Sequence, residues 1–318
     1  MTKVIIQIPC LNEEESLGTV LKTLPRELPG VDVVEWLIID DGSTDATVKV
    51  AKEHGVDHIV THRKNRGLAK AFYSGILGCL QQDADIIVNT DADNQYCSSS
   101  IPDLVKPIVD KRADLVVGAR PIDEVVHFSS TKKVLQKFGS FVVGKISKTN
   151  VTDAPSGFRA LSRDAAASLN VFTEYTYTLE TLIQAGSNNF NVLSVPVRVT
   201  SSFRPSRLVS SIPSYIFKSV ITMIRSLAVY SPFQFFMWPA MISLITGLAL
   251  GFRFLYYYIT TGGAGHVQSV ILCSLLLIAA VIFFTVGFLA DLIGANRKMI
   301  KNIELNMLSQ KKTNENCS

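Results

Sequence analysis

The chain has 318 residues, which is enough for two domains and a sizeable core. Its formal net charge of +4 is mild, and no basic and aromatic groove pattern accompanies it, so a nucleic-acid-binding protein is excluded. The mean hydropathy of +0.27 is high for a soluble protein, and the apolar excess lies in the last third of the chain. The five cysteines form no CxxC pair, which argues against a disulfide framework and a zinc site.

Short apolar runs alternate with helix-period segments over the first two thirds of the chain. Strands are expected over 3–9, 34–40, 85–91 and 114–120, and a helix over 13–24. A second helix is expected to open within DGSTD, with Ser43 or Thr44 as its N-cap. This alternation predicts an α/β domain with a mostly parallel sheet, whose ligands bind beyond the carboxyl ends of the strands. The N-terminal apolar run is too short for a signal peptide, so we expect this domain to stay in the cytosol.

Two long apolar segments follow, over 235–259 and 267–292. Each exceeds the ~20 residues that a helix needs to cross a bilayer. Arg253 is the one charge in the first segment and lies near its end, where it can reach the interface. Gly247 and Gly251 form a GxxxG pattern, which is compatible with tight helix packing and with a homo-oligomer formed through these helices.

Lysine and arginine flank the pair of segments but are missing from the connecting loop 260–266. The positive-inside rule then places both termini and the N-terminal domain in the cytosol, at the cytoplasmic membrane or at the ER membrane of a eukaryote. Segment 208–232 has an apolar stripe and, on another face, Lys218 and Arg225, so it is expected to be an amphipathic helix at the membrane surface. The alternative is a helix packed on the N-terminal domain. The polar tail 302–318 is expected to be disordered beyond a short helix.

The motif TDADNQY carries the sharpest chemical signal. Asp91 and Asp93 flank one residue at the end of a predicted strand, and such close carboxylates repel one another unless a cation lies between them. Hard oxygen ligands suit Mg²⁺ or Mn²⁺, with substrate phosphates completing the shell, and Gln95 is a third candidate ligand. The alternative is a solvated acidic turn.

The segments PCLNEEE, DDGSTDAT, HRKNRGLAKAFYSGI and TDADNQY, in this order and spacing, resemble family 2 glycosyltransferases of the GT-A fold. DAPSGFRALSR resembles the branch that includes dolichol-phosphate mannosyltransferase and bacterial polyprenyl-phosphate glycosyltransferases. The resemblance covers about 3–207. It implies a Rossmann-like GT-A domain, which we place over 1–207. The hydropathy and charge pattern places the amphipathic helix at 208–232, two transmembrane helices within 233–294 and a cytosolic tail at 295–318. The resemblance also implies an inverting transfer, with Mg²⁺ or Mn²⁺, from a UDP- or GDP-sugar to polyprenyl phosphate.

The resemblance assigns the donor side to four groups of residues. Pro9, Leu11 and Glu13 look like the loop that holds the nucleoside, Asp40 and Asp41 like the acidic pair that contacts base and ribose, Lys70 like a group that approaches the phosphates, and Asp91, Asp93 and Gln95 like the metal and diphosphate site. Asp93 is also a candidate catalytic residue. For Lys70, a helix-surface lysine is the alternative.

On the acceptor side, Arg120 resembles a residue that meets the acceptor phosphate, and Asp153 and Ser156 belong to the motif that lines this side. Asp153 is the second candidate catalytic residue. Arg204 and Arg207, in FRPSRLV, stand where the branch usually carries a glycine- and lysine-containing loop that closes over the pyrophosphate. The positive charge is retained there, although proline and arginine replace the usual residues.

The five histidines show no ligand spacing and are expected on the surface or in loops. Two other functions stay open at this point: transfer to a saccharide or a different lipid, and a non-catalytic GT-A scaffold at the membrane. A processive polysaccharide synthase is disfavoured, because no QxxRW-type motif is evident. A channel or flippase is disfavoured, because two spans whose charged residues are Arg253 and Asp291 offer no pathway.

Overall fold

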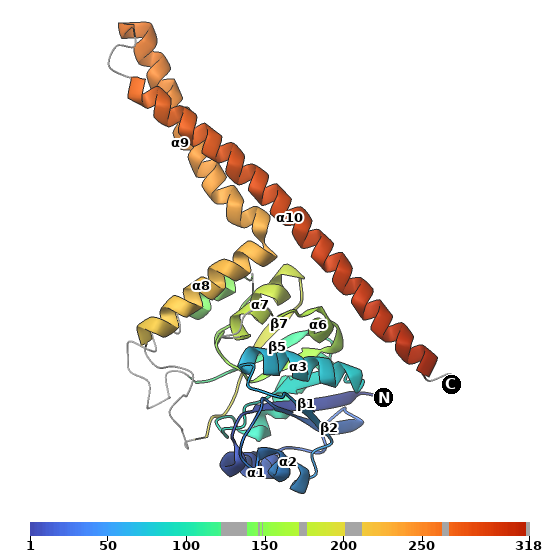
Figure 1. The fold of residues 1–318 in the computed structure, drawn as a ribbon. Coiled ribbons are helices and arrows are strands. Elements are labelled where there is room, and N and C mark those ends of the chain that lie inside the picture. Colours follow the sequence, from blue (N-terminus) through green and yellow to red (C-terminus); the bar gives the residue numbers. More distant parts are fainter. Residues whose placement is uncertain are drawn as a thin grey trace. The chain divides into compact units, whose positions relative to one another are not determined.

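The computed structural model describes residues 1–121, 139–145, 147, 149–171, 177–200, 212–262 and 267–315. These residues fall into two compact units, Met1–Met223 and Ile224–Ser318, and each is described by itself. Figure 1 shows the elements of both units along the chain.

The first unit is built on a sheet with the strand order β3-β2-β1-β4-β6-β5-β7 among the described residues. The strands are β1 (Lys3–Cys10), β2 (Val33–Asp40), β3 (His58–Thr61), β4 (Ile86–Asn89), β5 (Leu115–Ala119), β6 (Arg159–Ser162) and β7 (Val192–Pro196). Only β6 runs antiparallel to its neighbours in this sheet. The mostly parallel α/β sheet is therefore confirmed, with one reversed strand that the apolar pattern did not predict.

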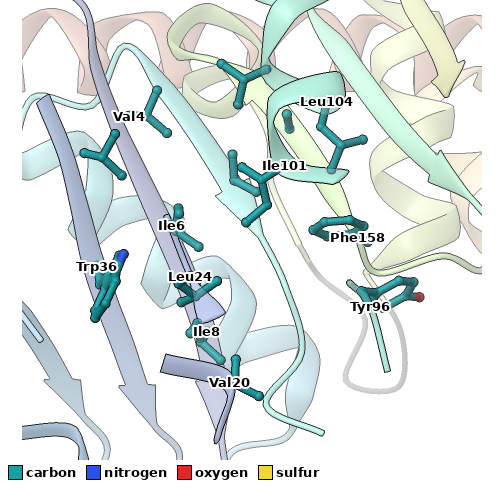
Figure 2. Close-up of a cluster of buried hydrophobic side chains, with 14 of the residues drawn as sticks. Val4, Ile6, Ile8, Val20, Leu24, Trp36, Tyr96, Ile101, Leu104 and Phe158 are labelled. Atoms are coloured by element: carbon teal, nitrogen blue, oxygen red, sulfur yellow. The ribbon is translucent and has the colours of Figure 1, made fainter. Parts of the chain in front are cut away.

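Helices cover both faces of this sheet, which is why its strands are apolar on both sides. They are α1 (Glu14–Thr23), α2 (Thr47–Glu53), α3 (Leu68–Gln81), α4 (Ile101–Val109), α6 (Arg163–Ser168) and α7 (Thr178–Ser187), with a 3₁₀ turn at Ser98–Ser100. Alternate residues of β1 serve the two cores: Val4, Ile6 and Ile8 pack with α1 and α4 (Figure 2), whereas Ile5 packs with α3 and α7.

The start of α2 differs from the prediction. The helix begins at Thr47, and its N-cap position, Ala46, makes no side-chain capping bond. Ser43 is used elsewhere, because its hydroxyl accepts a hydrogen bond from Asn12 N at 3.0 Å. The predicted cap at Ser43 or Thr44 was therefore wrong. The Asp45 carboxylate takes the role instead by accepting from Thr47 N at 3.0 Å.

Helix α8 (Ile212–Tyr230) falls inside the predicted amphipathic segment. Met223 packs against the core that includes α3 and α7. Phe217, Val220, Ile221 and Ile224 are all exposed large apolar side chains. One part of the helix thus packs on the domain, while another part presents an apolar surface of the kind that binds a partner or a membrane.

Two helices of the second unit, α9 (Pro232–Thr261) and α10 (Val267–Glu315), are each long and apolar enough to cross a membrane. They pack side by side (Figure 1). A Cβ built on Gly247 would lie 3.2 Å from Leu277 Cδ2, and one on Gly251 would lie 3.1 Å from Cys273 Sγ. The predicted GxxxG pattern therefore packs α9 against α10 of the same chain.

Helix α10 does not stop after its apolar part. It continues to Glu315, so the expectation of a tail disordered beyond a short helix was wrong. From Ala295 onward the sequence has no glycine or proline and is rich in good helix formers, so nothing ends the helix there. By contrast, α9 ends at Gly262, which has the left-handed φ of 74° that favours glycine at helix ends.

Candidate active site

The predicted site residues follow strands that end at one edge of the sheet. Cys10 of β1 pairs with Asp40 of β2, and Gln7 of β1 pairs with Asn89 of β4. Pro9 is the penultimate residue of β1 and is buried. The loops after β1, β2 and β4 therefore leave the sheet side by side, where α/β proteins bind their ligands.

The loops after β1 and β2 are joined to each other by hydrogen bonds. Thr44 N donates to Asn12 Oδ1 at 2.8 Å, and Glu13 N donates to Thr47 Oγ1 at 2.9 Å. Asn12 adopts a left-handed φ of 54°, which asparagine tolerates better than most residues. The predicted nucleoside loop, with Leu11 and Glu13, is thus held against the loop that follows Asp40.

Asp40 and Asp41 are both buried, but they have different partners. Asp40 Oδ1 accepts from Ser43 N at 2.9 Å. The Asp41 carboxylate accepts from Arg66 N and Gly67 N, each at 2.9 Å. Because Gly67 immediately precedes α3, Asp41 supplies the negative charge that the start of this helix favours. The sequence did not predict these two hydrogen bonds, which link the residue after β2 to the loop after β3.

His62 lies in the loop after β3, as expected of the histidines, but it is not on the surface. It is buried, its Nδ1 lies 2.7 Å from Asp41 Oδ1, and its Nε2 lies 2.9 Å from Ser74 Oγ. The reason is topological: β3 pairs in parallel with β2, so the residue after β3 meets the residue after β2. His127 and His266 lie outside the described residues. Lys70 is partly buried in the first turn of α3.

The acidic loop Thr90–Tyr96 follows β4. Asp93 Oδ1 accepts from Gln95 N at 3.0 Å, and Asn94 has a left-handed φ of 57° that turns the chain. Burial, and then the neighbouring Asp93 carboxylate, raises the pKa of Asp91 to about 7, against the opposing effect of Arg120 and Arg159. A divalent cation between two such carboxylates would relieve this repulsion.

The residues present therefore fit a divalent ion of the Mg²⁺ or Mn²⁺ type. Their ligand atoms are oxygens, as these hard cations prefer. Across the described ranges, no group of three or more His, Cys, Asp or Glu side chains is gathered as a closed metal site. An ion at Asp91, Asp93 and Gln95 would thus need substrate or water oxygens to complete its shell, as is usual for Mg²⁺ at phosphate sites.

Arg120 and Asp153, which the sequence placed separately on the acceptor side, form one unit. Arg120 follows β5, and its Nε and Nη2 donate to the two carboxylate oxygens of Asp153 at 2.7 and 3.0 Å. Arg120 N adds a third, longer bond of 3.2 Å. Asp153 is fully buried, so this bidentate pair fixes the direction of the guanidinium.

Arg159 is a site residue that the sequence reasoning missed. Its guanidinium is fully buried and donates to the carbonyls of Ala154, Ser156 and Thr178 at 2.7–2.8 Å. Burial lowers the pKa of Arg159 to about 10, although Tyr177, Tyr96, Asp153 and Asp91 oppose the shift. The side chain thereby ties the segment that carries Asp153 and Ser156 to α7. The sign of this buried role in the sequence is an arginine that stands between apolar residues in SGFRALS.

The segment 198–200 runs beside the acidic loop. Thr200 N donates to Gln95 O at 2.9 Å, and Cys97 N donates to Arg198 O at 3.1 Å. The residues that precede Arg204 and Arg207 in the chain are therefore hydrogen-bonded to the acidic loop and to Cys97. These two arginines lie outside the described residues, so their predicted role stays a prediction.

Residues 5–169 match the model of glycosyl transferase family 2, which is more than half of the chain. The chain belongs to this family. A UDP-N-acetylglucosamine–dolichyl-phosphate N-acetylglucosaminyltransferase of Methanococcus voltae is 30% identical over 215 residues, which cover 60% of this chain and 83% of that protein. An undecaprenyl-phosphate mannosyltransferase of Micrococcus luteus is 30% identical over 176 residues, which cover 53% of this chain and 70% of that protein.

The fold of this glycosyltransferase also matches solved structures. Glucosyl-3-phosphoglycerate synthase of Mycobacterium tuberculosis, in complex with Mn²⁺, UDP-glucose and phosphoglyceric acid, aligns with a TM-score of 0.53 and 20% identity over 70% of this chain and 79% of that one. The likeness confirms the expected GT-A fold. In this family 2 glycosyltransferase, the acidic loop lies next to the segment that carries Asp153 and Ser156, because Tyr96 Oη lies 3.5 Å from Ser156 Oγ.

Proposed function

We propose that this glycosyltransferase moves a sugar, with inversion, from a UDP- or GDP-sugar to polyprenyl phosphate at the cytosolic face of a membrane. The main support for the proposal is the Asp91–Asp93 pair at the carboxyl edge of the sheet. The two carboxylates repel each other, and a bound divalent cation would reduce that repulsion. The names of the M. voltae and M. luteus relatives support the acceptor.

On the donor side, Asp91, Asp93 and Gln95 would hold Mg²⁺ or Mn²⁺, which stabilises negative charge on a departing nucleoside diphosphate. Pro9, Leu11, Glu13 and Asp40 would surround the nucleoside, and Lys70 would approach the phosphates. Asp41 would act by holding the loop after β3, since its carboxylate accepts from Arg66 N and Gly67 N.

On the acceptor side, the chemistry of the nucleophile favours a phosphate. A sugar hydroxyl needs a positioned base. A phosphate monoester has its second pKa near ~6 and is already largely dianionic, so it needs cations that hold it. Arg120, directed by Asp153, would hold this phosphate near Ser156 while one of its oxygens bonds to the anomeric carbon and the bond to the donor diphosphate breaks. Arg204 and Arg207 would add charge.

The membrane part of the proposal rests on three helices. Helices α9 and α10 are long and apolar enough to cross a bilayer, and α8 exposes Phe217, Val220 and Ile221. An apolar helix surface of this kind is suited to the interface, at the depth of a lipid phosphate. We propose two spans with both termini in the cytosol, because the cations lie outside the connecting loop.

The decisive experiment offers the purified full-length protein polyprenyl phosphate with a panel of UDP- and GDP-sugars and identifies the product by mass. We expect a glycosylated polyprenyl phosphate from one of the donors. Glycosylation of free saccharides or lipid alcohols, with polyprenyl phosphate ignored, would leave the donor half standing and refute the acceptor half. Binding of Mn²⁺ and nucleotide without any transfer would favour the non-catalytic scaffold.

A further inference from the structure

Two buried amide side chains lie inside the sheet beneath the acidic loop. Gln7 of β1 and Asn89 of β4 are both fully buried, in strands whose other residues are mainly apolar. They are partners in the β1–β4 register, and Gln7 Nε2 donates to Asn89 Oδ1 at 2.9 Å. Burial of an amide side chain costs free energy unless its polar atoms are hydrogen-bonded. A buried pair of amides that bond to each other therefore indicates a specific structural role.

Asn89 holds the main chain at Gly157, next to Asp91. Asn89 Nδ2 donates to Gly157 O at 2.9 Å and to Tyr177 Oη at 3.0 Å. Both ends of the Asn89 amide are thereby satisfied. The neighbours of Gly157 are fixed as well, because Gly118 N donates to Phe158 O at 2.8 Å.

Gly157 lies between the Tyr177 hydroxyl and the Asp91 carboxylate. A Cβ built on Gly157 would stand 2.8 Å from Tyr177 Oη, and 3.2 and 3.4 Å from the two carboxylate oxygens of Asp91. Gly157 is not among the glycines with a positive φ, so its backbone conformation would accept alanine. Glycine is thus required here for space, and its bare α-carbon lets the Asp91 carboxylate lie against the main chain.

Tyr177 cannot easily yield to a side chain at position 157. Its ring is stacked on Phe72, with centroids 3.8 Å apart and an interplanar angle of 6°, and it is buried. The hydroxyl is also fixed by the bond from Asn89. A Cβ at position 157 would therefore be pushed toward the other side, where Asp91 is.

We propose that Gly157, held by Asn89 and backed by the Tyr177 hydroxyl, is a positioning residue that sets where the Asp91 carboxylate stands for binding a divalent cation. The inference rests on the proposed function, in which Asp91 is a ligand of Mg²⁺ or Mn²⁺. It assigns to Gly157 and Asn89 a supporting role of the kind that groups behind a metal ligand play, by orienting the ligand without touching the ion.

The test measures uptake of Mn²⁺ by the full-length protein, from the loss of the free-ion electron paramagnetic resonance signal, with UDP and with GDP in parallel. Gly157→Ala should weaken Mn²⁺ binding by roughly 10-fold, the usual effect of disturbing a group behind a metal ligand. The double variant Gly157→Ala/Tyr177→Phe lacks the Tyr177 hydroxyl, whose oxygen is the atom nearest to the new Cβ, so most of the Mn²⁺ affinity should return.

Gly78→Ala is the matched control. Its Cβ would stand 3.1 Å from Leu37 Cδ1 and from Val60 Cγ2, so it crowds the core under α3 away from Asp91. We expect Gly78→Ala to lower the thermal midpoint but to bind Mn²⁺ as the wild type does. A purely structural role for Gly157 predicts the same pattern for Gly157→Ala.

A folded Gly157→Ala protein with wild-type Mn²⁺ affinity would overturn the inference. If that variant does not fold, Asn89→Ala takes its place, since it frees the Gly157 carbonyl. Weaker Mn²⁺ binding by folded Asn89→Ala supports the inference, and unchanged binding overturns it. The wild-type titration separates this result from the larger one: a wild type that takes up no Mn²⁺ with either nucleotide refutes the metal half of the proposed function and, with it, this inference.

Discussion

At the scale of single residues, the site depends on how each buried charge is balanced. Asp153 is balanced by Arg120 in a bidentate pair, and Asp41 by two backbone N–H groups. Asp91 has no such arrangement with a neighbouring cation in the described residues, and burial with Asp93 raises its pKa to about 7. This difference is the reason for proposing Asp91 as a ligand of a divalent cation.

The first prediction concerns Asp91→Asn. The amide keeps the shape of the side chain but removes the charge that a divalent ion needs, so turnover should fall on the order of 10²-fold or more. Sugar transfer is measured with and without EDTA. Full activity of the wild type in EDTA, or of the variant in any condition, would contradict metal dependence through this residue.

The second prediction separates the two members of the acceptor pair. Arg120→Ala should raise the KM for polyprenyl phosphate more than it changes nucleotide binding. It should also cost about 3 kcal/mol or more of stability, because it leaves the Asp153 carboxylate buried without its cation. Asp153→Asn keeps an oxygen acceptor for Arg120, so measurable activity should remain. Equal loss of donor and acceptor affinity in Arg120→Ala would show a general structural role instead.

At the scale of secondary-structure elements, the packing of α7 sets a strict limit. A Cβ built on Gly186 would overlap the backbone carbonyl of Ser147, which follows the helical residues 139–145. Because a backbone atom is in the way, no side chain can turn aside to make room. Glycine at this position lets α7 approach that segment closely.

The third prediction follows from this contact. Gly186→Ala should destabilise the protein by at least about 3 kcal/mol, since the backbone has to shift. Gly139→Ala is the control, because no atom of the described chain lies within 4 Å of its Cβ. It should be neutral or slightly stabilising, as alanine favours a helix over glycine. Thermal unfolding of the two variants measures the difference, and equal midpoints would refute the predicted close packing.

The strands also show which parts of the fold could be predicted from the sequence. β1 and β2 were predicted to within a residue or two at each end, because strands buried on both faces read as unbroken apolar runs. The reversed direction of β6 and the partners of His62 were not predicted. Both depend on which strands become neighbours, and periodicity along a chain carries no such information. The α/β sheet was predicted from the alternation of elements, and the GT-A fold from the order and spacing of PCLNEEE, DDGSTDAT, HRKNRGLAKAFYSGI and TDADNQY.

The site was predictable in a similar, partial way. Asp91, Asp93, Arg120 and Asp153 were identified by their residue types and motifs, but their pairing was not. Arg120 and Asp153 are 33 positions apart in sequence, and only the fold brings them to 2.7 Å. Arg159 was missed because three of its acceptors are backbone carbonyls, which every residue has, and the fourth, Thr181 Oγ1, is brought to it only by the fold.

At the scale of the whole molecule, the distribution of lysine and arginine along the chain predicts the membrane topology. Arg297 and the lysines that follow it lie beyond the second apolar segment, and Arg225 lies before the first, whereas the loop 260–266 has no lysine or arginine. Positive charge close to a membrane span favours the cytosolic side. A catalytic domain that consumes nucleotide-sugars is expected on that side too, so the charge pattern and the proposed reaction agree.

The last prediction tests this arrangement with the full-length chain in its membrane. A reporter fused at Gly263 should appear on the side opposite the catalytic domain, and one fused after Ser318 on the same side, because two spans return the chain to where it started. A cysteine introduced by Gly263→Cys gives an independent measure through labelling with a membrane-impermeant reagent. Of the native cysteines in the catalytic domain, Cys10 and Cys79 are buried and Cys97 is partly exposed, so the wild-type chain gives the background labelling. Labelling of position 263 from the cytosolic side would place both helices on one face of the membrane, and the proposed two-span topology would then have to be abandoned.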